Sequence, residues 1–185
     1  MDPTDLTGRL LVASPMLRAP EFSRTVIKLL DHGDGGALGV IINRPGDAPL
    51  IEVVPPVADI ASSPAVLFAG GPVEPRAAIA LGVTIGDAAG DGWRPLTPPL
   101  VTVDLDSDPD VLASSLRELR VFAGYAGWSA GQLEGEIEQG AWYVVDAMPD
   151  DTFNDVPDQL WRRVLRRQPW PLSAVSTCPA DPGMN

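Results

Sequence analysis

Short runs of apolar and β-branched residues, separated by glycine and proline, recur along most of the chain. Runs of this length between turn-forming residues are typical of β-strands. We therefore expect eight strands, at residues 7–14, 24–31, 36–42, 65–69, 77–83, 100–105, 121–126 and 142–147. The second and third flank the segment His32-Gly33-Asp34-Gly35, in which glycine supplies the positive φ that a tight hairpin loop requires. The proline-rich segment 47–64 leaves room only for a short helix or an irregular crossing.

Helical spacing of apolar residues predicts two further elements. Asp108 is placed to cap a helix that begins at Pro109, which is a favoured first helical position. Its apolar face would consist of Val111, Leu112, Leu116 and Leu119. A final helix, residues 157–168, carries an apolar stripe opposite a face of four arginines. The stripe consists of Leu160, Trp161, Val164 and Leu165.

The segment 119–140 carries the most specific local pattern. Its apolar run predicts a buried strand, and a short helix should follow the turn at Gly127. Ser129 and Gln132 match a capping box, with Ser129 as the N-cap. Trp128 and Leu133 have the spacing of a hydrophobic staple, and Gly140 can end the helix from a left-handed conformation. Local helix-start chemistry therefore explains most of these residues without a ligand.

Eight strands and three helices that do not alternate regularly predict an α+β fold with a mixed or antiparallel sheet. We find no internal repeat and no linker, so residues 1–168 are expected to form a single compact domain. Beyond Pro169 the chain is rich in proline. We therefore expect residues 169–185 to be a disordered tail.

Composition bounds the class of protein. The hydrophobic fraction is 45% and the mean hydropathy +0.07, and no apolar run approaches the roughly 20 residues that span a bilayer. The N-terminus is acidic and lacks the basic region of a signal peptide, and the one cysteine, Cys178, excludes an internal disulfide framework. We therefore expect a cytoplasmic protein without a membrane partner.

The net charge of −12 disfavours direct nucleic-acid binding, because that binding draws on cations which displace counterions from phosphates. Positive charge is almost all arginine, and Lys28 is the only lysine. The one basic cluster is the arginine face of the final helix, which would be the nucleic-acid site if there is one. An alternative is a solvated face that pairs with surplus carboxylates. The cluster consists of Arg162, Arg163, Arg166 and Arg167.

Candidate catalytic and metal chemistry is sparse. His32 and Cys178 are the only His and Cys, so one chain cannot build a zinc site of the usual four ligands. Carboxylates at Glu134, Glu136 and Glu138 could hold a hard cation, although neighbouring carboxylates on a short helix are usually solvated. We expect no metal and no cofactor. His32 is not supported as a base by any G-x-S-x-G motif, and we interpret it as a turn residue with a hydrogen-bonded ring.

Two glycine clusters could in principle cradle phosphate, but neither matches a known motif. Gly33-Asp34-Gly35-Gly36 precedes a strand rather than a helix and carries an aspartate that repels anions. Gly70-Gly71-Pro72 follows a strand, yet the proline removes one N–H donor. We interpret both as tight turns.

Taken together, several passages resemble the YqgE/AlgH family of bacterial proteins. The match runs in order from about Gly8 to Gln168. The passages are Phe22-Ser23-Arg24-Thr25-Val26, His32, Gly36-Ala37-Leu38-Gly39-Val40-Ile41-Ile42-Asn43-Arg44-Pro45, Gly70-Gly71-Pro72-Val73, Gly124-Tyr125-Ala126-Gly127-Trp128 and Gly131-Gln132-Leu133-Glu134 with Glu136. Thr25 stands where a serine is common, and the arginine-rich final helix and proline-rich tail also depart from the family pattern.

The resemblance implies a compact α+β fold and, for one branch, a role in the transcriptional regulation of exopolysaccharide synthesis. It supplies no catalytic residues. Our first hypothesis is therefore a non-enzymatic protein that binds a protein or small ligand and influences gene expression indirectly. The alternative is an enzyme or ligand-binding protein with a polar pocket near His32, Asn43 and Gln132. Candidate ligand-binding residues for that pocket are Arg24, His32, Asn43, Gly71, Gln132 and Glu136. The partner and the oligomeric state are open.

Overall fold

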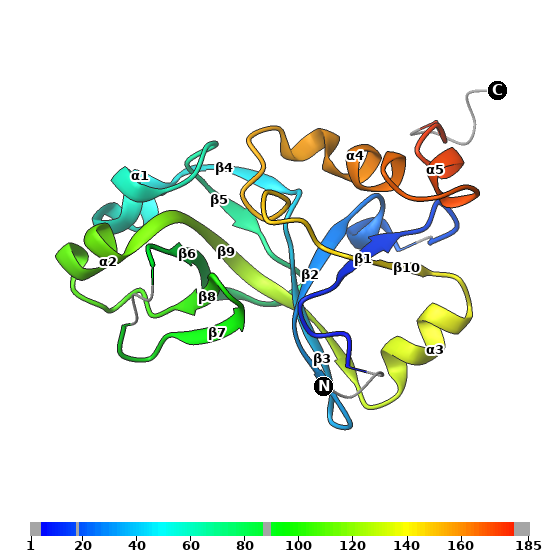
Figure 1. The fold of residues 1–185 in the computed structure, drawn as a ribbon, viewed down its shortest axis with the longest axis horizontal. Coiled ribbons are helices and arrows are strands. Elements are labelled where there is room, and N and C mark those ends of the chain that lie inside the picture. Colours follow the sequence, from blue (N-terminus) through cyan, green and yellow to red (C-terminus); the bar gives the residue numbers. More distant parts are fainter. Residues whose placement is uncertain (1–4, 18, 87–89, 180–185) are drawn as a thin grey trace.

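Ten strands form one curled sheet in the computed structural model, which describes residues 5–17, 19–86 and 90–179 (Figure 1). The strands are β1 (Leu10–Ala13), β2 (Val26–Gly33), β3 (Gly36–Ile41), β4 (Pro45–Pro49), β5 (Val66–Ala69), β6 (Val73–Thr84), β7 (Arg94–Thr97), β8 (Leu100–Val103), β9 (Leu116–Ser129) and β10 (Trp142–Val145). The described α-helices are α1 (Leu50–Val53), α2 (Pro109–Ser115), α3 (Gln132–Glu138), α4 (Leu160–Arg166) and α5 (Leu172–Val175). The 3-10 helices are η1 (Pro20–Phe22), η2 (Pro55–Ile60) and η3 (Pro157–Gln159).

Strand β9 joins the two halves of the sheet. The strand order is β10-β1-β2-β3-β9-β6-β8-β7, and β4 and β5 form a side branch that β5 attaches to β9. The first part of β9 pairs with β6 and β5, and its last four residues pair with β3. Gly124 has a φ of +68° where the strand passes between these partners. A Cβ there would lie 2.5 Å from the carbonyl oxygen of Gly71, so the crossing requires glycine.

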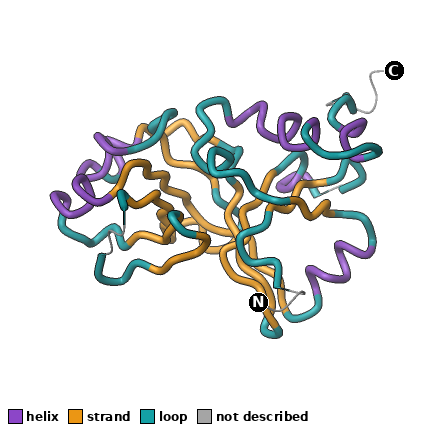
Figure 2. The backbone as a smooth tube through the Cα atoms, in the orientation of Figure 1, coloured by secondary structure: helices purple, strands orange, loops and turns teal. Residues whose placement is uncertain are grey.

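The helices lie around the sheet in three groups (Figures 1 and 2). Helices α4 and α5 pack on each other, and α4 contacts β1. Helix α3 lies beside β10, β9 and β3. Helices α1 and α2 with η2 lie at the other end, near β4, β5 and the start of β9. The strands therefore run through the middle of the molecule, the helices lie along its top and at its two ends, and β7 and the β2–β3 hairpin reach its lower edge (Figure 1).

Alternation along β2 divides the core into two faces, because successive side chains of a strand point to opposite sides of a sheet. Val26 and Leu30 belong to the cluster that includes the apolar residues of α4, whereas Ile27 and Leu29 belong to the cluster under α3. Lys28 occupies the position between Val26 and Leu30. A third cluster packs α2 and η2 against β6, β8 and β9.

Most predicted elements are confirmed, including the hairpin of β2 and β3 and the cap of α2. In that cap, the Asp108 side chain accepts a hydrogen bond from the Asp110 N–H at 2.8 Å. The buried stripe of the last helix is also confirmed. The α+β class holds; among the described strands, β5 and β9 pair in parallel and the other strand pairs are antiparallel. The expectation of about three helices is imprecise.

Several predicted boundaries are wrong. Helix α2 ends at Ser115, and Leu116 and Leu119 belong to β9, where sheet pairing overrides their helical spacing. Strand β4 begins at Pro45 and extends into the segment 47–64, for which we expected only a short helix or an irregular crossing, and β7 was not predicted. The sequence also indicates a loose acidic loop at residues 86–92, which lies partly outside the described residues.

The C-terminal segment also differs from expectation. Residues 169–179 are described, and they include α5, whose Leu172 and Val175 pack against the main core cluster. The prolines of this segment predicted disorder. Its apolar side chains at helical spacing instead pack it against the core. Residues 180–185 lie outside the described part of the chain. Among the described helices, none has the length and apolar character to cross a bilayer.

Candidate functional site

Glu136 on α3 is the centre of a polar network that fastens the helix to the sheet. Its Oε2 accepts hydrogen bonds from the indole N–H groups of Trp128 at 2.9 Å and Trp142 at 2.7 Å. Its Oε1 accepts one from the Gln132 side-chain amide at 3.0 Å. The two indoles are buried and meet edge to face, with centroids 6.0 Å apart. This carboxylate is therefore occupied by structural donors.

The predicted capping box is present only in part. Gln132 Oε1 accepts a hydrogen bond from the Ser129 backbone N–H at 3.1 Å, as the motif requires. However, Ser129 ends β9, and the N-cap of α3 is Gly131, with a φ of +74°. Leu133 shares a core cluster with Trp128, and Gly140 has a φ of +75° after the helix. The glycine stop is confirmed, and Ser129 as N-cap is wrong. With Gly131 as the N-cap, Trp128 and Leu133 share a core cluster but do not occupy the N′ and N4 positions of a hydrophobic staple.

His32 lies in β2 rather than in the hairpin loop, because β2 continues to Gly33. Its ring is hydrogen-bonded, as expected. Nδ1 accepts from the Leu6 N–H at 3.2 Å, and Nε2 lies 2.9 Å from Glu134 Oε1. The side chain is only 6% exposed. Both ring nitrogens therefore join the N-terminal segment and α3 to the hairpin.

Asn43 and Arg24 lie at the opposite end of β2. Asn43 Oδ1 accepts from the Val26 N–H at 2.8 Å, and its amide donates to the Arg24 carbonyl at 2.9 Å, so it serves the backbone. The Arg24 guanidinium donates to the carbonyls of Cys178, at 2.6 Å, and Pro179, and lies 4.5 Å from the Trp161 ring centroid. Partial burial lowers the Arg24 pKa. Arg24 thus holds the C-terminal segment.

Gly71 marks a close approach of two backbones. A Cβ at this position would lie 2.1 Å from the Tyr125 carbonyl carbon, which no side chain can tolerate. The six predicted ligand-binding residues therefore do not converge. Gln132 and Glu136 form one group and Arg24 and Asn43 another, while His32 and Gly71 serve separate contacts.

The arginine face of the last helix is partly engaged within the chain. Arg162 donates to the carbonyls of Ser176 and Cys178, at 2.7 and 3.2 Å. Arg167 forms a two-point ion pair with Asp151, at 2.6 and 2.7 Å. Only Arg163 and Arg166 are exposed. Our alternative interpretation was that these arginines pair with carboxylates of the same chain. Arg167 forms such a pair.

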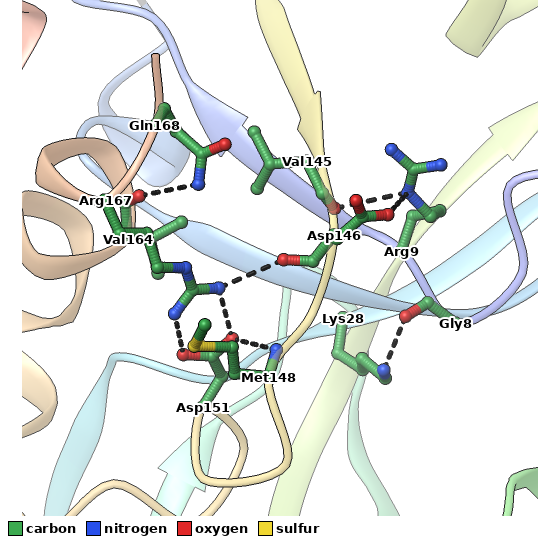
Figure 3. A network of polar contacts seen from close by, with 10 residues as sticks. All are labelled: Gly8, Arg9, Lys28, Val145, Asp146, Met148, Asp151, Val164, Arg167 and Gln168. Carbon is green, nitrogen blue, oxygen red and sulfur yellow. Dashed lines mark hydrogen bonds and ion pairs between the residues drawn. The ribbon is translucent and has the colours of Figure 1, made fainter. Parts of the chain in front are cut away.

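A different residue, Lys28, has the features of a functional group. It stands in the centre of β2, is 3% exposed, and pairs in register with Leu10 of β1 and Val40 of β3. Its ammonium donates to the Gly8 carbonyl at 2.5 Å, the one hydrogen bond it makes among the described residues (Figure 3). Burial lowers the pKa of Lys28 to about 8, although the nearby Asp151 opposes the shift.

The carboxylate of Asp151, whose charge acts on Lys28, forms no ion pair with it. Asp151 is buried, and its oxygens accept from Arg167 and from the Met148 N–H at 2.6 Å (Figure 3). Asp146 pairs with Arg9 at 3.1 Å (Figure 3). Lys28 is therefore a buried amine that is paired with neither of these two carboxylates among the described residues.

Lys28 lines a cavity of about 240 Å³. Its wall combines the turn before β1, the β7–β8 turn, the start of β9 and the loop after β10. The lining residues are Gly8, Lys28, Val83, Thr97, Pro98, Pro99, Leu100, Arg117, Glu118, Ala147, Met148, Pro149, Asp150 and Thr152. None of the six predicted ligand-binding residues is among them. Among the described residues, no group of three His, Cys, Asp or Glu could hold a metal ion.

Arg120 holds one wall of this cavity in place. It is 2% exposed and donates to the carbonyls of Thr152 and Asn154, both at 3.0 Å, and of Ser63 at 2.6 Å. Its guanidinium carbon lies 4.3 Å from the Phe68 ring centroid. Burial lowers the pKa of Arg120 to about 10. With Arg167 holding Asp151, two arginines thus fix the loop after β10.

A sequence signal for the Lys28 site existed. The run Thr25-Val26-Ile27-Lys28-Leu29-Leu30 places one cation at an inward position of an otherwise apolar strand. Lysine is rarely buried without a partner, so its presence there is a pointer to function. The walls of the cavity come from distant segments, and no local pattern reveals that they meet.

The chain matches relatives over nearly its full length. A family model described as DUF179, AlgH-like, matches residues 10–173. A UPF0301 protein of Streptomyces coelicolor is 47% identical over 98% of this chain and 96% of its own length. A UPF0301 protein of Thermobifida fusca is 50% identical, over 100% of this chain and 98% of its own.

Solved structures agree with this match. The fold is similar to a crystal structure of a Corynebacterium diphtheriae protein, with a TM-score of 0.87 and 34% identity over 93% of this chain and 92% of that one. It is also similar to the solution structure of the AlgH protein from Pseudomonas aeruginosa, with a TM-score of 0.72 and 28% identity over 97% of both chains. From its sequence and its fold, the chain belongs to the YqgE/AlgH family.

Proposed function

We propose that the protein binds a small molecule in the cavity at Lys28. The observation that carries the proposal is a buried amine with a single hydrogen-bond partner among the described residues, at the wall of a cavity. An ammonium has three donors, and leaving buried donors without partners is costly. A ligand that accepts hydrogen bonds from Lys28 would lower this cost. Binding at this position is therefore favoured, because the described residues offer the ammonium only one acceptor.

The size and lining of the cavity define the kind of ligand. Its volume of about 240 Å³ is below the range of roughly 300–1,000 Å³ typical of sites for drug-sized molecules. Apolar side chains such as Leu100 and Pro99 lie beside polar ones such as Thr152 and Glu118. This combination suits a small metabolite with one polar end.

Our first hypothesis from sequence, a non-enzymatic binding protein with an indirect effect on gene expression, continues as part of this proposal. The net charge of −12, and two of four arginines engaged within the chain, argue against direct nucleic-acid contact. A regulatory effect would then pass through protein contacts that respond to the ligand. The alternative pocket near His32, Asn43 and Gln132 has no support, because those side chains are used in separate structural contacts.

A matched pair of variants tests the proposal. Met148 is 55% exposed and lines the cavity, whereas Met16 is 84% exposed and does not. We expect Met148→Trp to close the cavity and Met16→Trp to leave it open. A panel of small metabolites would be screened by amide chemical shifts. At least one compound should shift the amides of cavity residues in the wild type and Met16→Trp, and not in Met148→Trp.

Two results would contradict the proposal. One is a panel in which no compound shifts cavity amides at millimolar concentration. The other is binding that Met148→Trp leaves unchanged, because the ligand would then occupy another surface. Thermal unfolding of both variants is the control for folding.

A further inference from the structure

Lys28 differs from an ordinary ligand-binding cation in that its amine is both buried and accessible from a cavity. We infer that the Lys28 amine reacts with a small aldehyde or ketone in this cavity to form an imine, an inference that rests on the proposed ligand-binding function.

The geometry leaves the amine nitrogen available for this reaction. Nζ donates to the Gly8 carbonyl at 2.5 Å and makes no ion pair among the described residues. Asp151, whose charge acts on Lys28, is held by Arg167 and by the Met148 N–H. A lysine in a close ion pair stays protonated and unreactive. Lys28 is free of that constraint.

Burial also supplies the neutral amine that nucleophilic attack requires. With a pKa of about 8, roughly a tenth of Lys28 is neutral at pH 7, compared with well under a thousandth for an ordinary lysine. The charged groups around it come from three elements. Asp150 and Asp151 lie in the loop after β10, Arg117 and Glu118 in β9, and Arg167 follows α4.

The cavity contains groups suited to the proton transfers of this reaction. The neutral amine attacks the carbonyl carbon, a C–N bond forms, and the carbonyl oxygen becomes a hydroxyl by taking up a proton. That hydroxyl takes up a second proton and leaves as water, and the C=N bond forms; the nitrogen gives up two protons in all, which balances the two that the oxygen takes up. Glu118 and Asp150 line the same cavity, and their carboxylates can relay the protons that leave the nitrogen to the departing oxygen. No oxidant or reductant is needed.

The composition of the chain allows an unusually clear test. Lys28 is the only lysine, so the α-amine is the only other primary amine. The protein would be incubated near pH 7 with propanal or pyruvate and with cyanoborohydride, which reduces an imine to a stable amine. Peptide mass mapping then compares labelling of Lys28 with that of the α-amine. We expect labelling of Lys28 to be saturable and at least tenfold faster in the folded protein than in urea.

Lys28→Arg keeps the cation and cannot form an imine, so it should lose the internal label and keep the terminal one. Met148→Trp should slow labelling of Lys28, and Met16→Trp should not. Labelling confined to the α-amine, or faster at Lys28 in urea than in the folded state, would overturn the inference. If a compound binds the cavity by chemical shift and is not trapped, the imine is excluded and the binding function stands. If compounds neither bind nor are trapped, both fail.

Discussion

Two cations lie buried in the sheet, Lys28 in β2 and Arg120 in β9, and their surroundings differ. Arg120 donates to three backbone carbonyls and stacks on an aromatic ring. Lys28 donates to one carbonyl and lines a cavity. Both are desolvated, and burial lowers both pKa values.

The difference separates a structural cation from a functional one. Arg120 connects the segment at Ser63 with the loop at Thr152 and Asn154, so its charge-assisted hydrogen bonds hold three parts of the chain together. Lys28 holds only the turn at Gly8. A buried charge that stabilises little is retained for another reason, and binding or reactivity is the reason that its cavity supports.

Arg120→Met should have the largest effect. It removes the donor of three carbonyls, two of them in one loop, and we expect a loss of about 3 kcal/mol in the free energy of unfolding. Urea denaturation measures it. Arg117→Met is the matched control on the same strand, where the side chain is exposed, and should change stability by less than about 0.5 kcal/mol. If Arg120→Met changed the free energy of unfolding by as little as the control does, Arg120 would not be a structural cation and would not differ from Lys28 in this respect.

Lys28→Met should have the opposite sign. Burying the ammonium costs about 3 kcal/mol, from a pKa lowered from 10.5 to about 8, while losing the bond to Gly8 costs about 1 kcal/mol. The variant should therefore be more stable than the wild type by about 1–2 kcal/mol near neutral pH, by the same denaturation assay. A loss of stability would mean that Lys28, like Arg120, is a structural tie.

The pH dependence of stability sharpens the same contrast. Because the Lys28 pKa is lowered on folding, the unfolded chain binds more protons between about pH 8 and 10.5, and stability contributed by this group rises with pH there. The wild type should gain about 1 kcal/mol between about pH 7 and 9 relative to Lys28→Met. Parallel curves for the two proteins would contradict a lowered pKa.

Arg24→Met should have the smallest effect. Its guanidinium also bonds carbonyls, those of Cys178 and Pro179, but it is only partly buried and it holds one terminal segment. We expect a loss of about 0.5 kcal/mol or less. Hydrogen exchange should accelerate in residues 172–179 and stay unchanged in β9. Faster exchange throughout the sheet would show that the segment supports the whole core.

Local chemistry predicted much of the fold. The Asp108-Pro109 start of α2, the β2–β3 hairpin and the buried face of α4 follow from short-range rules, and each is present. The errors arose where pairing with strands distant in sequence determines the local structure. Leu116 and Leu119 have helical spacing but pair with β6, and Pro45 enters a strand because β5 lies beside it.

The candidate site was less predictable than the fold. Glu136 and Gln132 stand out in sequence because they fasten α3, so a specific pattern indicated architecture rather than binding. Lys28 was visible as the only lysine, yet its meaning depends on Met148, Thr97 and Glu118 reaching the same cavity. Those contacts are set by the curl of the sheet, which the hydrophobic pattern does not specify.

Because β9 pairs with both β3 and β6, each half of the sheet would have an unpaired edge strand without it. Disrupting β9 would therefore remove a pairing partner from β3 and from β6 at the same time. The molecule should consequently unfold in a single cooperative step, and separately expressed halves, cut anywhere before or after β9, should not both be able to fold.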